Sequence, residues 1–294
     1  MKNLEKFGKV KYNYPLSYLT TFKIGGAAKA VVWINKEVFL PEIISYLRKI
    51  SCPYYILGKG SNVLALDEGF CGVIIKPVFK EIYYQKEENR VVLTVSSGLK
   101  ISELLNFCLK NNLSGLEFLA GIPGSIGGAI FGNAGAFGYC IGERVKRIKI
   151  FSPKTGIFWK EWSKKHFGYR KTDLSSEIVI LKAELLLEFS SKDKIKKSIN
   201  NYFRKKLNTQ PLFSPSAGCV FKNPDKASAG YLIEQAGLKG KKIGDAKISE
   251  KHANFIINTG KAKAKDVLEL IKLIQTEVKK QTGIKLEPEI RIIQ

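Results

Sequence analysis

The stretch from Phe118 to Gly142, FLAGIPGSIGGAIFGNAGAFGYCIG, constrains the fold of this chain more than any other feature. It contains no charged residue, although 26% of the chain is charged. Between positions 121 and 138, glycine occupies 121, 124, 127, 128, 132, 135 and 138. Glycine allows positive φ and a close approach of the backbone, and so dense a run costs too much chain entropy for ordinary core. We therefore expect a backbone surface that packs against a flat or anionic ligand, with N–H groups as donors.

A transmembrane segment and a tight glycine-packed turn in the core are the alternatives for this stretch. A membrane span needs about twenty mainly apolar residues. Here Pro123, Ser125, Asn133 and the glycines interrupt the apolar run, and the sequence offers no second span. The ligand-binding interpretation is therefore the better of the three.

Length and composition predict a soluble globular protein of two or three domains. The chain has 294 residues, of which 45% are hydrophobic and 11% aromatic, enough to build a large core. The first residues, MKNLEKFGKVKYNY, lack the apolar region of a secretory signal, so we expect a cytoplasmic protein.

Cysteine and histidine counts argue against disulfides and metal sites. The five cysteines form no CxxC pair, and their odd number favours reduced thiols. Only two histidines are present, His166 and His252, which makes a histidine-built metal site improbable. We expect no metal.

The formal net charge of +23 suggests an attraction to anions. The basic runs are scattered, lysine outnumbers arginine, and no nucleic-acid-binding motif is present. We interpret the charge as mostly solvated, with a modest role in attracting an anionic substrate, and we expect neither a nucleic-acid nor a membrane partner.

Hydrophobic periodicity predicts alternating helices and strands. Residues 12–34 suggest strand, tight turn and strand, with Thr20–Ile24 in the first strand. Helices are expected over 38–51, over 102–111 with Ser102 as N-cap, and over 265–282 with Gly283 after it. Residues 286–293 are expected to form a terminal strand whose even-numbered apolar residues share one face. The pattern is that of an α+β protein.

A second glycine-containing turn, Gly58-Lys-Gly-Ser-Asn62, follows a short apolar strand. Consecutive backbone N–H groups and a serine hydroxyl around such a turn suit a phosphate group. The turn matches neither the GxGxxG fingerprint nor a Walker A loop, so an ordinary hairpin turn remains the alternative.

Three polar residues are candidates for chemistry. Cys219, in AGCVFKNP, could be a nucleophile or a proton donor, or a buried small side chain. Arg170, in a Tyr-Arg loop, could pair with a carboxylate or lie in solvent. Glu289 alternates with apolar residues and could equally belong to a solvated face. Spacing alone does not bring the three together.

Eight segments along the chain form a specific combination. They are LTTFKIGG (19–26), LGKGSNVLALDEGFCGVII (57–75), GLEFLAGIPGSIGGAIFGNAGAFG (115–138), YRKT (169–172), SAGCVFKNP (216–224), GYLIEQAGLKG (230–240), KHANFIIN (251–258) and LEPEIRII (286–293). They span nearly the whole chain, and together they are far more specific than any one of them. In this order they resemble the UDP-N-acetylenolpyruvoylglucosamine reductase family, in the shorter subclass that lacks an inserted tyrosine loop.

The resemblance implies an FAD-binding domain of the vanillyl-alcohol-oxidase (PCMH) type, made of two α+β subdomains, and a C-terminal α+β substrate domain. The expected division is 1–78, 79–203 and 204–294. It also implies a peptidoglycan-precursor enzyme in which NADPH reduces FAD. The flavin then passes hydride to the enolpyruvyl group of a UDP-sugar, giving UDP-N-acetylmuramate. We expect this protein to act as a monomer.

The resemblance assigns catalytic roles to the three candidates. Arg170 would hold the enolpyruvyl carboxylate and stabilise the charge that develops after hydride addition. Glu289 would assist the same charge, with Glu287 as the alternative. Cys219 would donate the proton. The motif resembles a family form that has serine there; a thiol, with an ordinary pKa near 8.5, releases a proton more readily than an alcohol but is open to oxidation.

Binding residues follow from the same motifs. Tyr169, Arg204, Asn223, Lys239 and His252 would contact substrate, Asn223 at the diphosphate or nucleotide part, while His252 could instead be structural. The residues expected to bind FAD are Leu57, Gly58, Lys59, Gly60, Ser61, Asn62, Val63, Leu64, Gly121, Ile122, Pro123, Gly124, Ser125, Gly127, Gly128, Asn133, Ala134 and Gly135.

Two other functions compete with this interpretation. A different flavoenzyme of the same fold, such as an alcohol oxidase, would often attach FAD covalently through His or Cys, but both histidines lie outside the glycine stretches. A basic nucleic-acid-binding protein would be colourless and would bind DNA or RNA in a salt-sensitive way.

Overall fold

The computed structural model describes residues 3–88 and 90–294, and its chain divides into two compact units. The first unit comprises Met1–Lys11, Val31–Lys59 and Val73–Lys205, and the second comprises Tyr12–Ala30, Gly60–Gly72 and Lys206–Gln294. Each unit is therefore built from segments far apart in the sequence. The division into 1–78, 79–203 and 204–294 stays a prediction.

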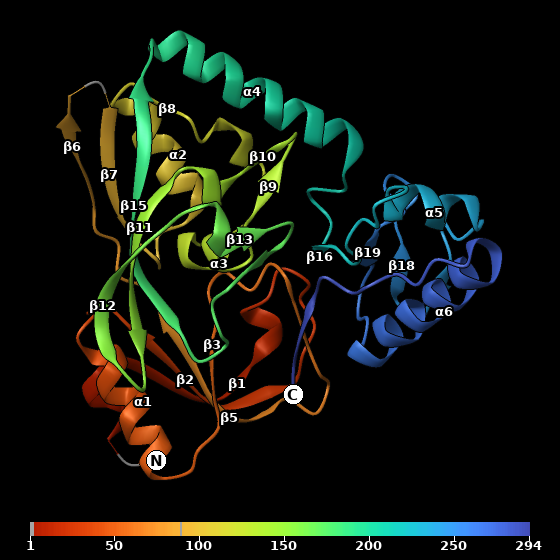
Figure 1. The fold of residues 1–294 in the computed structure, drawn as a ribbon. Coiled ribbons are helices and arrows are strands. Elements are labelled where there is room, and N and C mark those ends of the chain that lie inside the picture. Colours follow the sequence, from red (N-terminus) through yellow and green to blue (C-terminus); the bar gives the residue numbers. More distant parts are fainter. Residues whose placement is uncertain (1–2, 89) are drawn as a thin grey trace. The chain divides into compact units, whose positions relative to one another are not determined.

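The first unit contains a large antiparallel sheet with two helices on one face (Figure 1). Its strand order is β12 (Gly156–Glu161), β11 (Val145–Ser152), β15 (Val179–Phe189), β7 (Arg90–Ser96) and β6 (Ile82–Glu87). The helices are α2 (Ile101–Lys110) and α3 (Ile126–Phe131), and α3 lies against β15 and β7. Helix α3, which belongs to the glycine-rich stretch, therefore packs directly against the sheet.

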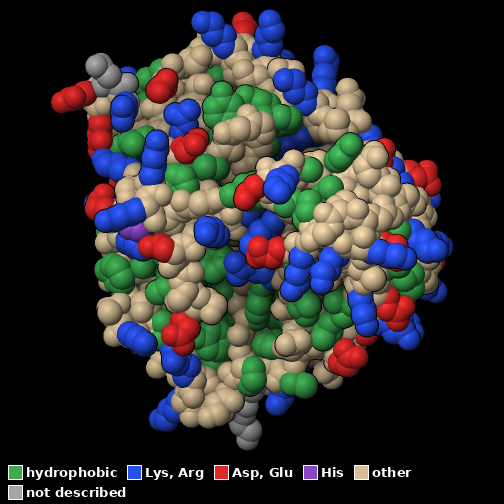
Figure 2. Space-filling view, turned by 45° about the vertical axis from the view of Figure 1, so that its right-hand side comes forward, with side chains coloured by type: hydrophobic (Ala, Val, Ile, Leu, Met, Phe, Trp, Pro, Cys, Tyr) green, Lys and Arg blue, Asp and Glu red, His purple; other side chains and the backbone are tan. Residues whose placement is uncertain are grey.

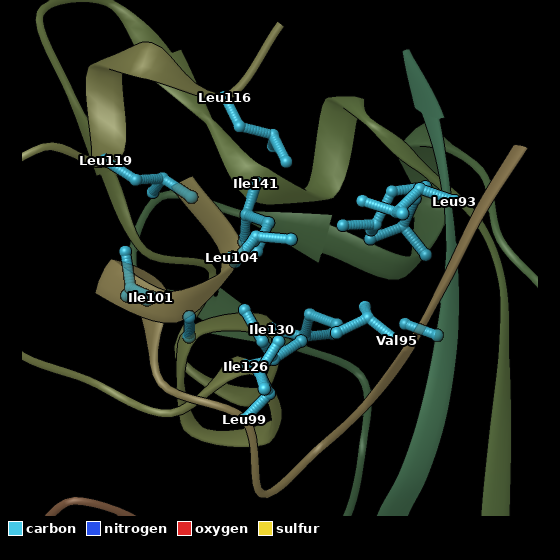
Figure 3. Close-up of a cluster of buried hydrophobic side chains, with 14 of the residues drawn as sticks. Leu93, Val95, Leu99, Ile101, Leu104, Leu116, Leu119, Ile126, Ile130 and Ile141 are labelled. Atoms are coloured by element: carbon cyan, nitrogen blue, oxygen red, sulfur yellow. The ribbon is translucent and has the colours of Figure 1, made fainter. Parts of the chain in front are cut away.

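Apolar side chains between this sheet and its helices form the core of the first unit (Figure 3). Leu93 of β7 and Leu104 of α2 are completely buried. Ile126 and Ile130 of α3 are buried in the same cluster, whereas Gly128 is exposed. Helix α3 therefore keeps its isoleucines in the core and leaves a glycine surface uncovered, because apolar residues four apart lie on one helix face.

A smaller four-stranded sheet has the order β1 (Lys9–Pro15), β2 (Ala27–Ile34), β5 (Phe70–Pro77) and β3 (Tyr54–Ile56), with β3 parallel to β5. Helix α1 (Phe39–Lys49) connects β2 to β3 and buries Leu40, Ile43, Ile44 and Leu47. The helix predicted over 38–51 is therefore confirmed.

The strand expected over Thr20–Ile24 was wrong, because these residues form turns and irregular backbone. The Thr20 hydroxyl donates to the Ile24 carbonyl at 3.2 Å, and Lys23 has a φ of 56°. A local side-chain bond of this kind offers the backbone an alternative to a sheet ladder.

The second unit has a sheet of order β16 (Ser216–Cys219), β19 (Phe255–Asn258), β18 (Ala246–Ile248) and β17 (Lys242–Ile243). Helices α5 (Ala229–Gln235) and α6 (Ala264–Thr282) contribute to its core together with the completely buried Ile248 and Ile256. In a further parallel pair, β4 (Val63–Ala65) lies beside β20 (Arg291–Ile293). Gly283 follows α6 with a φ of 72°, so the predicted helix end is confirmed.

Helix α4 (Lys192–Thr209) carries the chain from the first unit into the second. The remaining elements are short. They are strands β8 (Leu113–Ser114), β9 (Gly135–Ala136), β10 (Tyr139–Cys140), β13 (Phe167–Gly168) and β14 (Lys171–Thr172), and 3₁₀ turns η1 (Leu4–Phe7), η2 (Leu16–Tyr18), η3 (Glu117–Leu119), η4 (Ile141–Glu143) and η5 (Lys164–His166).

Two sequence-based details need correction. Helix α2 begins at Ile101, with Lys100 as N-cap in place of Ser102, and the Glu103 carboxylate accepts the Lys100 N–H at 3.0 Å. Residues 286–293 are not one alternating strand. Only Arg291–Ile293 forms β20, and Pro288 and Ile292 are exposed while Leu286 is buried, because the segment pairs at separate points with two other segments.

The face in Figure 2 carries Lys and Arg side chains that are dispersed among acidic and apolar ones. No helix in the described part of the chain is long and apolar enough to cross a membrane.

Asp67 links the loop after β4 to the beginning of α6 within the second unit. Its carboxylate oxygens accept the Ala264 N–H at 2.9 Å and the Lys265 N–H at 3.1 Å. An anion at a helix N-terminus satisfies backbone donors that have no partner in the helix.

We expect Asp67→Ala to lower the free energy of unfolding by about 1 kcal/mol, because these donors lose their acceptor. Urea denaturation measures the difference. Glu68→Ala is the control, since Glu68 is exposed and next in sequence. Equal effects of the two substitutions would show that Asp67 does not cap α6.

Candidate active site

The turn that follows β3 rests on the beginning of α3 within the first unit. The Leu57 N–H donates to the Ile75 carbonyl at 2.9 Å, which continues the β3–β5 pairing. A Cβ atom at Gly58 would lie 2.2 Å from Ser125 Oγ. Glycine is therefore required at position 58 by this close approach, and the two glycine-containing motifs are brought together.

Backbone donors in this turn are without protein partners. The N–H groups of residues 58–62 donate to no carbonyl or side chain in the part of the chain that the structure describes. Gly60 is buried, and Gly58, Ser61 and Asn62 are half-buried. A run of partly buried, unpaired N–H groups is suited to a phosphate or another anion.

The glycine-rich stretch lies along the segment that follows β7. Ile126 donates its N–H to Leu99 at 2.9 Å, and Gly127 donates to Ser97 at 2.8 Å. A Cβ atom at Gly127 would lie 2.7 Å from the Ser97 Cβ. Glycine at position 127 therefore permits a close contact with Ser97 that a side chain would prevent, and the expectation that this stretch faces a ligand stays a prediction.

Asn133 connects this stretch to the loop that carries Arg170. Its side chain is buried, its Nδ2 donates to the Gly168 carbonyl at 2.8 Å, and its Oδ1 accepts the Gly142 N–H at 3.0 Å. Thr172 adds a bond from Oγ1 to the Phe131 carbonyl at 3.0 Å. The Asn133 side chain therefore serves as an anchor for the neighbouring loop.

Arg170 sits in the bend between β13 and β14. It has a φ of 54°, and its guanidinium lies 5.4 Å from the ring centroid of Tyr169. Both flanks of the bend are tied to the glycine-rich stretch, at Gly168 and at Thr172. A left-handed backbone at a non-glycine residue is costly and is common at functional sites. Arg170 is half-buried and Tyr169 is exposed.

Cys219 lies next to residues 60–62 of the glycine-containing turn, within the second unit. β16 is bulged between Ser216 and Cys219, and Gly218 there has a φ of 78°. A Cβ atom at Gly218 would come within 4.0 Å of the Ser61 carbonyl. Thr21 links the two segments, because its N–H donates to the Gly60 carbonyl and its hydroxyl donates to the Ser216 carbonyl. The Cys219 side chain is half-buried and is not in a disulfide.

Glu289 is held beside the same segments by its backbone. Its N–H donates to the Val220 carbonyl at 2.7 Å, and its carbonyl accepts from Asn62 Nδ2 at 3.2 Å. The Arg291 N–H also donates to the Asn62 carbonyl. The second unit thus brings together Cys219, Glu289 and the turn residues 60–62.

Glu287, the alternative to Glu289, differs in its surroundings. Its carboxylate forms an ion pair with Lys222 at 2.5 Å, and its side chain is 70% exposed. Glu289 is half-buried. These contacts favour Glu289 as the functional glutamate.

Asn223, Lys239 and His252 gather around α5. Asn223 Oδ1 accepts the Ala229 N–H at 3.0 Å, so part of this side chain caps the helix. His252 Nδ1 accepts the Asn254 N–H at 3.3 Å. Burial, together with the charge of Lys239, lowers the pKa of His252, which keeps the imidazole neutral near pH 7. Arg204 lies on the exposed side of α4 in the first unit.

The residue that the sequence analysis missed is Lys76, at the end of β5. Its Nζ donates to the Gly58 carbonyl. The sequence offers only a lysine after the apolar run 73–75, and the pairing of this strand with the one that leads into the turn is seen only in the structure.

Two family models match the chain. One, described as an FAD-binding domain, matches residues 28–159. The other, described as the C-terminal domain of UDP-N-acetylenolpyruvoylglucosamine reductase, matches residues 210–293. The predicted α+β fold, with an FAD-binding domain of the vanillyl-alcohol-oxidase type before a C-terminal domain, is confirmed.

Relatives that carry the name UDP-N-acetylenolpyruvoylglucosamine reductase match nearly all of this chain. The protein of Syntrophobacter fumaroxidans is 41% identical and covers 96% of this chain and 83% of its own. That of Bacillus subtilis is 41% identical, with 97% and 94% covered. The crystal structure of the Thermus caldophilus reductase superposes with a TM-score of 0.82 at 33% identity, with 97% and 98% covered. This chain therefore belongs to the UDP-N-acetylenolpyruvoylglucosamine reductase family.

Proposed function

We propose that this protein is an NADPH-dependent flavoenzyme that reduces the enolpyruvyl group of UDP-N-acetylglucosamine enolpyruvate to UDP-N-acetylmuramate, in peptidoglycan precursor synthesis. The observation that carries the assignment is that hydrogen bonds from Thr21, Asn62 and Glu289 join the segments of Cys219, of Glu289 and of turn residues 60–62 in one unit. Family membership supplies the reaction, and these contacts supply residues able to support it.

The residues fit FAD at the two glycine-containing motifs. The unpaired N–H groups of residues 58–62 suit the cofactor diphosphate, and the exposed Gly128 with the half-buried Gly121 and Gly124 leaves backbone that a flat ring system can approach. Bound FAD supplies hydride transfer from NADPH to the substrate. Binding, orientation and proton transfer are the tasks of the protein.

Arg170 binds the substrate carboxylate. Hydride added to the far carbon of the enolpyruvyl double bond places negative charge on the carbon beside that carboxylate, and on the carboxylate itself. A guanidinium held in a fixed bend stabilises the negative charge of the transition state more than it stabilises the bound substrate. The anchors at Gly168 and Thr172 hold the bend, which limits the reorganisation needed during reaction.

Cys219 donates the proton that completes the reduction. Its thiol proton passes to the carbanionic carbon, the remaining thiolate regains a proton from solvent, and one hydride and one proton are added in total. Glu289, when protonated, donates a hydrogen bond to the same charge. Asn223, Lys239, His252, Tyr169 and Arg204 contact the UDP-sugar, whose diphosphate suits the cationic and amide donors among them.

The proposal also covers the oligomeric state, the location, the partners and the domain division of the protein. The protein acts as a monomer in the cytoplasm, without a nucleic-acid or membrane partner. Dispersed rather than clustered basic side chains on the face in Figure 2 support a solvated role for the net charge of +23. The chain is divided functionally into segments 1–78, 79–203 and 204–294.

We expect a purified protein that is yellow and that oxidises NADPH only when UDP-N-acetylglucosamine enolpyruvate is present. The loss of NADPH absorbance, followed with and without this substrate, measures the coupling. Oxidation at the same rate without substrate, or none with it, would contradict the assignment.

A further inference from the structure

Lys76 brings a second cationic side chain, after Lys59, to the turn of residues 58–62. It is half-buried at the end of β5, and its Nζ donates to the Gly58 carbonyl. The charged group that faces it is Lys59, on the same turn. Neither amine forms an ion pair within the part of the chain that the structure describes. The two positive charges repel each other, and an anion bound at the turn would relieve this repulsion.

The Lys76–Gly58 bond also sets the direction of the next donor. In a trans peptide the C=O and N–H of one unit point in opposite directions, and no described peptide bond is cis. Because Lys76 holds the Gly58 carbonyl, the Lys59 N–H points to the other side of the turn. That N–H belongs to the unpaired set of residues 58–62. Lys76 thus fixes the direction of the Lys59 N–H without accepting a hydrogen bond from it.

Burial and the neighbouring charge act together on the Lys76 amine. Desolvation is the larger cause and the Lys59 charge the smaller, and they lower the pKa of Lys76 to about 8. A fraction of the protein without cofactor therefore carries a neutral amine at mildly alkaline pH. An anion bound at the turn would favour the charged form.

We propose that Lys76 is a positioning residue for FAD, which orients the 58–59 peptide toward the cofactor diphosphate and contributes a positive charge that strengthens binding. This inference rests on the proposed function only in taking FAD as the cofactor. The Lys59 and Lys76 charges offset the negative charge of the diphosphate, and their mutual repulsion is relieved when it binds.

The proposal has a defined pH dependence. The diphosphate raises the pKa of Lys76 in the complex above its value in the protein without FAD. FAD affinity is therefore constant below about pH 8 and falls as pH rises through that value, by at most tenfold per pH unit for one proton. Between pH 7 and pH 9 the dissociation constant should rise about tenfold.

The test measures the FAD dissociation constant of protein stripped of cofactor, by flavin fluorescence, at several pH values from 6 to 9. Lys76→Met removes charge and donor and should bind FAD about tenfold more weakly at pH 7, with no further change up to pH 9. Lys76→Arg keeps a charge over the whole range and should also give a flat profile, at an affinity close to that of the unchanged protein at pH 7. Lys154→Met, in the exposed β11–β12 turn, is the matched control and should keep the full pH dependence.

The outcomes of these measurements separate the role of Lys76 from the identity of the cofactor. Unchanged pH dependence in Lys76→Arg, or a weaker but equally pH-dependent affinity in Lys76→Met, would overturn the inference while leaving FAD as the cofactor. Absence of FAD binding to the unchanged protein at any pH would overturn the proposed function as well. Thermal unfolding of each variant without FAD shows whether a lost affinity reflects a lost fold.

Discussion

Replacing Cys219 by alanine is expected to stop the oxidation of reduced flavin by the enolpyruvyl substrate, while NADPH still reduces the flavin. The alanine removes the proposed proton donor, and a positioned general acid contributes about 10²- to 10⁴-fold. The turn contacts of Thr21 with Gly60 and Ser216 do not involve the thiol, so the cofactor site should persist.

Rapid mixing separates the two half-reactions. The rate of flavin reduction by NADPH should change little, and the rate of flavin recovery on addition of substrate should fall about 10³-fold. Cys219→Ser, which keeps a hydroxyl able to donate a proton, should recover most of the rate. Cys71→Ala is the matched control, because Cys71 is exposed on β5. Normal flavin recovery in Cys219→Ala would remove this residue from the proton-donor role.

Gly58→Ala should have the second large effect, a loss of FAD affinity of about 30-fold or more. The added Cβ would lie 2.2 Å from Ser125 Oγ, so either the turn or α3 must shift. A shift moves the unpaired N–H groups of residues 58–62 away from the positions that the diphosphate needs. A displacement of about 1 Å is enough to lose binding and rate at a preorganised site.

A double-mutant cycle tests the steric cause. Ser125→Ala removes the colliding oxygen and leaves the Ser125 Cβ position at 3.4 Å from the new Cβ, an ordinary contact. The pair Gly58→Ala and Ser125→Ala should therefore bind FAD more tightly than Gly58→Ala alone. Gly132→Ala, whose new Cβ would meet only the Gly128 carbonyl at 3.5 Å, is the control. Equal FAD affinities of Gly58→Ala and Gly132→Ala would show that the close contact between Gly58 and Ser125 does not matter for FAD binding.

Local signals in the sequence were enough for the long regular elements. The hydrophobic spacing and the glycine after it predicted α6 and its end at Gly283, and the observed helix is Ala264–Thr282. The start of α2 was missed, because Ser102 is a good cap by type while the Glu103 carboxylate satisfies the Lys100 N–H instead. Thr20–Ile24 was missed because a threonine hydroxyl binds a nearby carbonyl and turns the chain.

The site itself depends on contacts that spacing does not encode. Asn62 meets Glu289 across 227 positions of sequence, and Glu289 meets Val220 through a backbone bond. Motif resemblance named these residues, but only the fold joins them. Lys76 lies in no motif, and only the pairing of β5 with β3 places its amine on the Gly58 carbonyl.

The central claim is that a bound flavin is reduced by NADPH and reoxidised by the enolpyruvyl UDP-sugar. The most direct test is the visible absorbance of the purified protein without oxygen, recorded after NADPH and again after UDP-N-acetylglucosamine enolpyruvate. The account predicts flavin absorbance that bleaches with NADPH and returns with that substrate, one UDP-N-acetylmuramate formed for each NADPH consumed. A protein without flavin absorbance, or a reduced flavin that the substrate leaves bleached, would contradict it.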